Sequence, residues 1–156
     1  MGTWTNSDGL YIKFGDDEAK HALGGAVKTF QGVTTLEFII NASDFAAVGS
    51  NTILSDGLFI PSNAFIVSSN FYVETAFTGA TATVDFGLVR KNRTTEIDFD
   101  GFDATIAVAS LTAKASINGD GALIGTRLSQ AALVTARNNT ADLTAGKGVL
   151  TITYRI

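Results

Sequence analysis

The densest set of side chains that could do chemistry is a group of aspartates, Asp98, Asp100 and Asp103, in the segment DFDGFD. Their D-x-D-G-x-D spacing is similar to the first half of a calcium-binding loop, in which carboxylates at alternate positions coordinate the ion. The later ligands and the closing Glu of that motif are missing. We therefore favour a structural interpretation, in which Asp98 and Asp100 shape a turn and Asp103 caps a short helix over residues 104–111. A bound ion is the alternative.

Other candidates for chemistry lack partners. His21 is the only histidine and the chain has no cysteine, so neither a zinc site nor a catalytic triad can be assembled. The acidic run at 16–18 is typical of a solvated turn. A G-x-S-x-G elbow, an H-E-x-x-H helix and a Walker loop are all absent, although the glycines at 119 and 121 superficially suggest a phosphate loop. The sequence thus predicts no enzyme, and no catalytic, cofactor-binding or metal-binding residue.

Composition narrows the classes of partner. The 156 residues suit one domain, and a formal charge of −4 disfavours nucleic acid as a general partner. No apolar run approaches the roughly 18 residues of a membrane helix, so we expect no membrane association. Hydrophobic residues make up 46% of the chain and charged residues only 17%, whereas ordinary domains have about 25% charged. We expect the surplus apolar surface to be buried between copies in a homo-oligomer, with a trimer favoured over a dimer.

Apolar residues alternate with polar ones over several long stretches, and this two-residue period is typical of half-buried strands. The longest runs cover 65–77 and 82–88, which predict an antiparallel hairpin with Asp85 facing outward. Further strands are expected at 9–14, 34–42 and 148–156. Together with frequent glycine turns, these runs predict an all-β fold, namely a two-sheet antiparallel sandwich, jelly-roll-like, with one short helix. Residues 1–8 are expected to form an N-terminal arm, and residues 9–156 a single sandwich domain.

Exposed aromatic, apolar or basic residues are the candidates for contacts with a partner. Trp4 lies in the arm, Tyr11 has the outward parity of the first strand, and Ile66 and Tyr72 interrupt the polar face of the run at 65–77. A basic turn follows the second run of the hairpin. The predicted contact residues are Trp4, Tyr11, Ile66, Tyr72, Arg90, Lys91 and Arg93.

A family resemblance rests on four segments between residues 60 and 156, ETAFTGATATVDFGL, EIDFDGFDATIA, GDGALIG and TAGKGVLTITYRI, with an opening TWTNSDGLYIKFG. Their order resembles that of small structural proteins of tailed-phage virions. The resemblance is to strand and turn motifs and contains no catalytic signature. It implies a protein of the virion, and we expect a decoration or cement protein on the phage head surface, with the phage major capsid protein as its partner.

Two other roles remain open for the same sandwich. It could belong to the tail, fibre or knob, as a carbohydrate-binding module, although one Trp and three Tyr supply few platforms for sugars. A host-encoded β-sandwich binding module would instead be a monomer without affinity for particles. The major shell subunit itself is disfavoured, because the chain is short and lacks the long helix and mixed α/β pattern of the usual tailed-phage shell fold.

Overall fold

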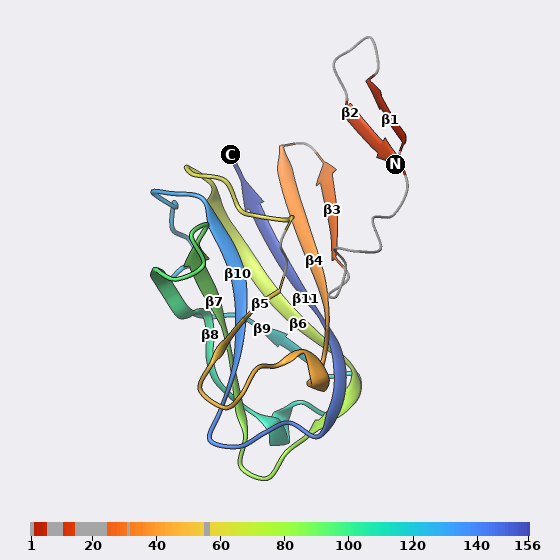
Figure 1. Cartoon of the computed structure of the whole chain (residues 1–156), viewed down its shortest axis with the longest axis vertical. Coiled ribbons are helices and arrows are strands. Elements are labelled where there is room, and N and C mark those ends of the chain that lie inside the picture. The colour runs from red at the N-terminus through yellow and green to blue at the C-terminus, as the bar shows by residue number, and fades with distance from the viewer. Residues whose placement is uncertain (1, 6–10, 15–24, 31, 55–56) are drawn as a thin grey trace.

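A computed structural model describes residues 2–5, 11–14, 25–30, 32–54 and 57–156, and side chains from residue 32 onward within those ranges. From residue 25 onward the described chain forms two sheets that pack face to face, and all strand pairs are antiparallel (Figure 1). The five-stranded sheet has the order β3 (Gly25–Phe30), β4 (Val33–Asn41), β11 (Ala145–Arg155), β6 (Phe65–Thr78), β9 (Ser116–Asn118). The four-stranded sheet has the order β5 (Asn51–Ile53), β10 (Ala132–Asn139), β7 (Thr83–Arg90), β8 (Glu96–Ala107).

The connections identify the sandwich as a jelly roll. Taken in sequence, β4 lies in the first sheet, β5 in the second, β6 in the first, β7 and β8 in the second, β9 in the first, β10 in the second and β11 in the first. Eight strands that cross between two sheets in this order define the double-sheet jelly roll. The predicted all-β, two-sheet antiparallel sandwich is therefore confirmed.

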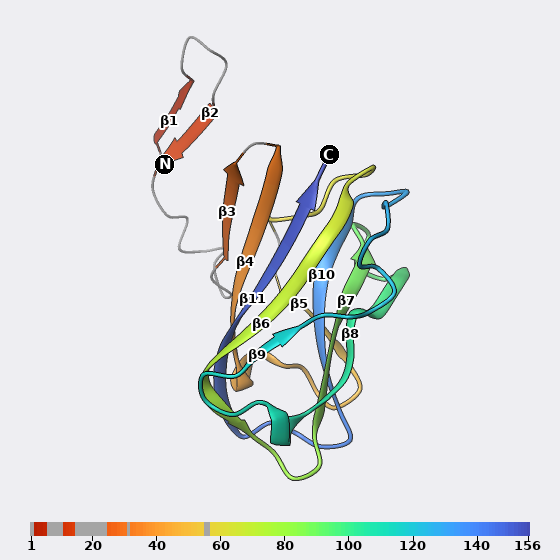
Figure 2. The same ribbon diagram turned by 180° about the vertical axis from the view of Figure 1, so that it is seen from behind.

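The N-terminal segment contributes a separate hairpin. β1 (Gly2–Thr5) pairs with β2 (Tyr11–Phe14) in a two-stranded sheet of its own, with Trp4 opposite Ile12. Figures 1 and 2 show this hairpin beyond β3, outside the two sheets of the sandwich. The division into an arm over 1–8 and a domain over 9–156 stays a prediction. His21 and the acidic run at 16–18 lie outside the described residues.

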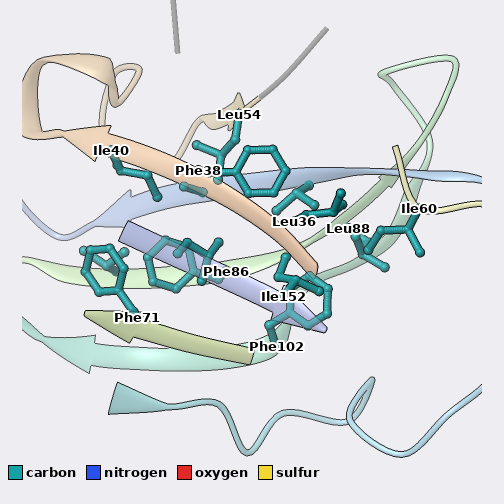
Figure 3. Close-up of a cluster of buried hydrophobic side chains, with 14 of the residues drawn as sticks. Leu36, Phe38, Ile40, Leu54, Ile60, Phe71, Phe86, Leu88, Phe102 and Ile152 are labelled. Atoms are coloured by element: carbon teal, nitrogen blue, oxygen red, sulfur yellow. The ribbon is translucent and has the colours of Figure 1, made fainter. Parts of the chain in front are cut away.

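Phenylalanines fill the space between the sheets. The Phe71 ring on β6 lies 4.9 Å from the Phe86 ring on β7, centroid to centroid, and 5.7 Å from the Phe77 ring (Figure 3). Phe38 on β4 and Phe102 on β8 are also fully buried in this core. Burying each such ring stabilises the fold by roughly 1.5–3 kcal/mol relative to an exposed ring. The alternating pattern thus reflects one shared core between two sheets.

A β-bulge in β6 changes which residues of that strand face the core. Opposite β11, Thr153 pairs with Ser68 but Tyr154 pairs with Ile66, so Val67 is an extra residue. Such a bulge reverses the side-chain parity along the strand. Ile66 is consequently fully buried, whereas Val67 is 41% exposed. The prediction that Ile66 is a surface contact residue was wrong, because strict alternation was extended through the bulge.

The predicted helix over 104–111 was also wrong. β8 continues through Ala107, and only a single 3-10 turn, Val108–Ser110, follows it. Ile106 is held in β8 by pairing with Val84, and Asp103 pairs with Phe86, so Asp103 lies within a strand and caps no helix. Sheet pairing outweighs the weak local preference for helix here. A second short 3-10 turn, Ala42–Asp44, ends β4.

The predicted hairpin of 65–77 with 82–88 is not formed. These runs became β6 and β7, which lie in different sheets and face each other across the core. The intervening chain passes from one sheet to the other, close to the backbone of Asp142 at Gly79. Alternation identifies the buried face of a strand but carries no information about its neighbours in the sheet.

Candidate functional site

The most buried carboxylate among the described side chains is held in a polar cluster between strands. Asp85 on β7 was predicted to face solvent but is only 3% exposed. Its Oδ2 accepts hydrogen bonds from the Arg137 guanidinium, at 2.7 and 3.2 Å, and from Asn139 Nδ2 at 2.6 Å. Its Oδ1 accepts the Thr105 N–H at 2.7 Å. These contacts satisfy the carboxylate and join β7, β8 and β10, which indicates a structural role.

Asp85 is covered because β8 is bulged where it pairs with β7. Leu88 pairs with Asp98 but Phe86 pairs with Asp103, so β8 has extra residues opposite Gly87. This bulged segment crosses directly over Gly87, where a side chain would meet the Asp98 carbonyl and the Phe99 backbone. A face that alternation predicts to be solvated is therefore partly enclosed.

The aspartates of β8 do not come together as a metal site. Among residues with described side chains, no group of three or more acidic or histidine side chains is arranged to hold an ion. Burial, and then the nearby Asp120 carboxylate, raise the pKa of Asp103 to about 6. Burial also raises the pKa of Asp98, with a further contribution from its hydrogen bond with Asp100. Like charges that share a partly buried position favour the protonated form.

The basic turn between β7 and β8 has a defined conformation. The Arg90 N–H donates to the Thr95 carbonyl at 2.9 Å, and the Arg93 N–H to the Arg90 carbonyl at 2.8 Å. Arg93 has φ +67°, and Asn92 Oδ1 accepts the Thr95 N–H at 3.0 Å. Lys91 Nζ lies 3.8 Å from the centroid of the Phe59 ring, which is 40% exposed. The turn thus presents exposed cations beside an exposed aromatic ring.

A second exposed surface crosses the outside of the five-stranded sheet. Tyr72 on β6 pairs with Val149 on β11, which pairs in turn with Ile39 on β4. Tyr72 and Ile39 are each 41% exposed. We call these three residues the outer apolar row. Beside it, Asn70 Nδ2 donates to Asn118 Oδ1 at 2.8 Å, so the row has polar neighbours on β6 and β9.

The predicted contact residues fall in three different places. Tyr72 belongs to the outer apolar row, and Arg90, Lys91 and Arg93 lie together in the turn at one end of the sandwich. Trp4 and Tyr11 are placed in β1 and β2, but their side chains are outside the described part of the chain. Ile66 is in the core.

Sequence analysis missed two exposed residues of these surfaces. Ile39 gave a detectable signal, because it is an apolar residue at an outward position that breaks the alternation of its strand. Phe59 gave none, because its neighbour Lys91 is distant in sequence and no pattern links the two.

Within the described residues, no helix is long and apolar enough to cross a membrane. No protein-family model matches the chain, and no curated protein does.

Solved structures with a similar fold come from phage capsids. A chain of the cyanophage Pam1 capsid asymmetric unit is 16% identical, with a TM-score of 0.55 and 97% of both chains covered. A chain of the Ralstonia phage GP4 capsid is 18% identical, with a TM-score of 0.54, and the match covers 80% of this chain and 84% of that one. A chain of the acidic stable capsid of Helicobacter pylori bacteriophage KHP30 is 16% identical, with a TM-score of 0.54, 86% of this chain and 93% of that one being covered. At these identities the likeness establishes a shared fold.

Proposed function

We propose that this chain is a structural protein of a tailed-phage virion, and specifically a decoration or cement protein bound to the outside of the head. The observation that carries the proposal is the fold similarity over 97% of both chains to a chain of the cyanophage Pam1 capsid. The Ralstonia phage GP4 and KHP30 capsids supply two further matches. A fold is compatible with several functions, so the site features must agree with this one.

The exposed surfaces agree with attachment rather than with chemistry. The buried carboxylate Asp85 is saturated by hydrogen bonds within the protein. By contrast, the outer apolar row and the basic turn present large side chains to solvent on ordered backbone. Aromatic residues and arginine are enriched where proteins bind one another. We propose no catalytic role and no cofactor.

In this role the protein adds contact area between subunits of the phage major capsid protein. Each copy contributes weak contacts, and repetition by the symmetry of the shell makes their sum large. The proposed contact residues are Trp4, Tyr11, Tyr72, Arg90, Lys91 and Arg93. We also propose self-association as a trimer, which would bury part of the exposed apolar surface and which sedimentation velocity at micromolar concentration tests.

Labelling of intact phage particles tests the location. Antibodies against the full chain, imaged by electron microscopy on particles of the phage that encodes it, are expected to decorate the head. Label confined to the tail would support the fibre or knob alternative, and a glycan array would then examine sugar binding. Particles without label, together with a monomeric protein that does not bind heads, would overturn a virion role.

A further inference from the structure

The strand register gathers basic residues from distant parts of the chain at one end of the sandwich. Arg90 ends β7, and Ala132, at the start of β10, lies opposite it. Ala132 also bridges to Ile60, which brings the segment that contains Phe59 to the same end. Thus Arg90, Lys91, Arg93 and Phe59 lie together although the turn and Phe59 are far apart in sequence.

The other sheet contributes two more arginines to this end. Phe65, the first residue of β6, lies between Arg155 on β11 and Arg127, with which it forms an isolated bridge. In both Figure 1 and Figure 2 the ends of β11 and β7 and the starts of β6 and β10 are drawn at the same end of the molecule, around the C-terminus. We define the cationic end as Arg90, Lys91, Arg93, Arg127 and Arg155 with Phe59 and Phe65.

Several of these side chains are held in place by contacts within the protein. The Arg155 guanidinium lies 4.8 Å from the centroid of the Phe65 ring, and Lys91 lies over Phe59. Arg127 Nη1 donates a hydrogen bond to the Asn63 carbonyl. The five cationic residues are nevertheless exposed. Because these side chains are already held in place, they lose less conformational entropy when a partner binds.

The charge of this end opposes that of the whole chain, which is −4. Elsewhere, Arg137 pairs with Asp85 and Lys147 pairs with Glu74 at 2.6 Å. No carboxylate of a described residue forms an ion pair with Arg127 or Arg155. An acidic protein that exposes a cationic end is steered by that end toward a negatively charged surface.

We infer that the cationic end is a docking surface for an acidic patch on another protein, whose carboxylates pair with the arginines. Guanidinium groups bind carboxylates and phosphates alike, so the charge of the rest of the molecule decides between protein and nucleic acid. Exposed Phe59 and partly buried Phe65 supply the apolar component of a protein interface. The net charge of −4 opposes a nucleic acid polyanion over the rest of the surface. The placement of this acidic patch on the phage shell rests on the proposed function. The inference that the partner surface is acidic does not.

The test compares binding of the full-length protein to three probes: labelled poly-L-glutamate, a 20-base-pair DNA duplex, and phage heads stripped of this protein. The variant Arg127→Gln with Arg155→Gln is expected to bind both poly-L-glutamate and heads about tenfold more weakly than the parent, since exposed ion pairs contribute up to about tenfold in affinity together. The control Lys114→Gln removes one exposed cation outside the cationic end and is expected to change binding less than twofold. Thermal melts check that each variant folds. The variant Arg127→Lys with Arg155→Lys preserves both positive charges and serves as the charge-matched comparison.

The outcomes separate this inference from the proposed function. Loss of binding in the Gln variant, retention in the Lys variant, and weakening by salt would support an acidic protein partner. Binding to poly-L-glutamate with that dependence but none to heads would support the docking chemistry and count against the virion role. Unchanged binding in the Gln variant, or tighter binding to the duplex than to poly-L-glutamate through the same arginines, would overturn the inference.

Discussion

At the scale of single residues, Asp85 shows how a charge is accommodated inside this sandwich. The carboxylate is compensated by the Arg137 guanidinium, Asn139 and the Thr105 N–H, and the side chain is 5% exposed. A buried ion pair contributes little net stability when compared with an apolar pair, but removing one partner leaves the other charge uncompensated. The Asp85–Arg137 pair therefore acts on the register of β7 with β10 and β8 more than on the free energy of unfolding.

We expect Asp85→Ala to lower the free energy of unfolding by about 3 kcal/mol, because Arg137 loses its counter-ion and the Thr105 N–H its acceptor. Urea denaturation measures this change. The matched control is Glu74→Gln, which breaks the Lys147–Glu74 pair; those side chains are 43% and 40% exposed. That substitution should cost less than about 1 kcal/mol. Equal effects of the two variants would show that the Asp85 cluster is not structural.

The pKa of Asp103 leads to a prediction about pH. Its pKa is about 6 in the folded protein and 3.8 ordinarily, because of burial and the charge of Asp120. The folded state thus binds this proton more tightly than the unfolded state, and stability from this group is full below about pH 4 and is lost as the pH rises through about 6. Asp103→Asn should raise the melting temperature at pH 7 and leave it nearly unchanged at pH 3.5. An equal increase in melting temperature at both pH values would contradict the raised pKa of Asp103.

At the scale of elements, the sequence revealed strands better than their irregularities. Alternation located the strands that became β4, β6, β7 and β11, because each has one face in a common core. It did not locate the extra residues in β6 and β8, since a bulge depends on how the neighbouring strand is paired. The incorrect placements of Ile66 and Asp85 both follow from these irregularities in strand pairing.

Gly87 tests the crossing of β8 over β7. A Cβ at this position would overlap the Asp98 carbonyl oxygen and Phe99 backbone atoms, far inside van der Waals contact distance, and these backbone atoms cannot rotate away. Gly87→Ala should therefore cost about 3 kcal/mol or more, as expected of overpacking against backbone. Chemical denaturation gives the value. Gly57→Ala is the control, because no heavy atom of a described residue beyond its chain neighbours lies within 4 Å of the added Cβ. It should change stability by less than about 0.5 kcal/mol. A mild effect at Gly87 would mean that β8 moves freely over β7.

At the scale of the whole molecule, composition and alternation predicted the class of fold but not its connections. The two-sheet sandwich followed from strands with one buried face. The contact of Phe71 with Phe86 across the core could not be told from a hairpin contact, because both arrangements bury the same residues. The candidate surfaces were accordingly predicted only in part, since Tyr72 stands out within its own strand whereas the grouping of Arg127 with Arg155 requires the folded register.

The outer apolar row gives a prediction for the proposed role on the phage head. Tyr72→Asp should weaken attachment to stripped phage heads about tenfold or more, because it places a charge in an apolar contact, while the melting temperature stays within a few degrees. Val48→Asp is the matched control, since Val48 is also 41% exposed but lies in the loop after β4, away from the row. Co-sedimentation of protein with heads measures both. Equal binding by the two variants would place the contact elsewhere on the molecule.

The position of β11 has a consequence for how the protein is made. This final strand lies between β4 and β6 and pairs with each along most of its length. During translation β4 and β6 are synthesised long before β11, so one edge of each strand stays unpaired until β11 has left the ribosome. The five-stranded sheet is therefore completed only by β11, and a nascent chain stalled before β11 would expose two unpaired strand edges and be a substrate for chaperones.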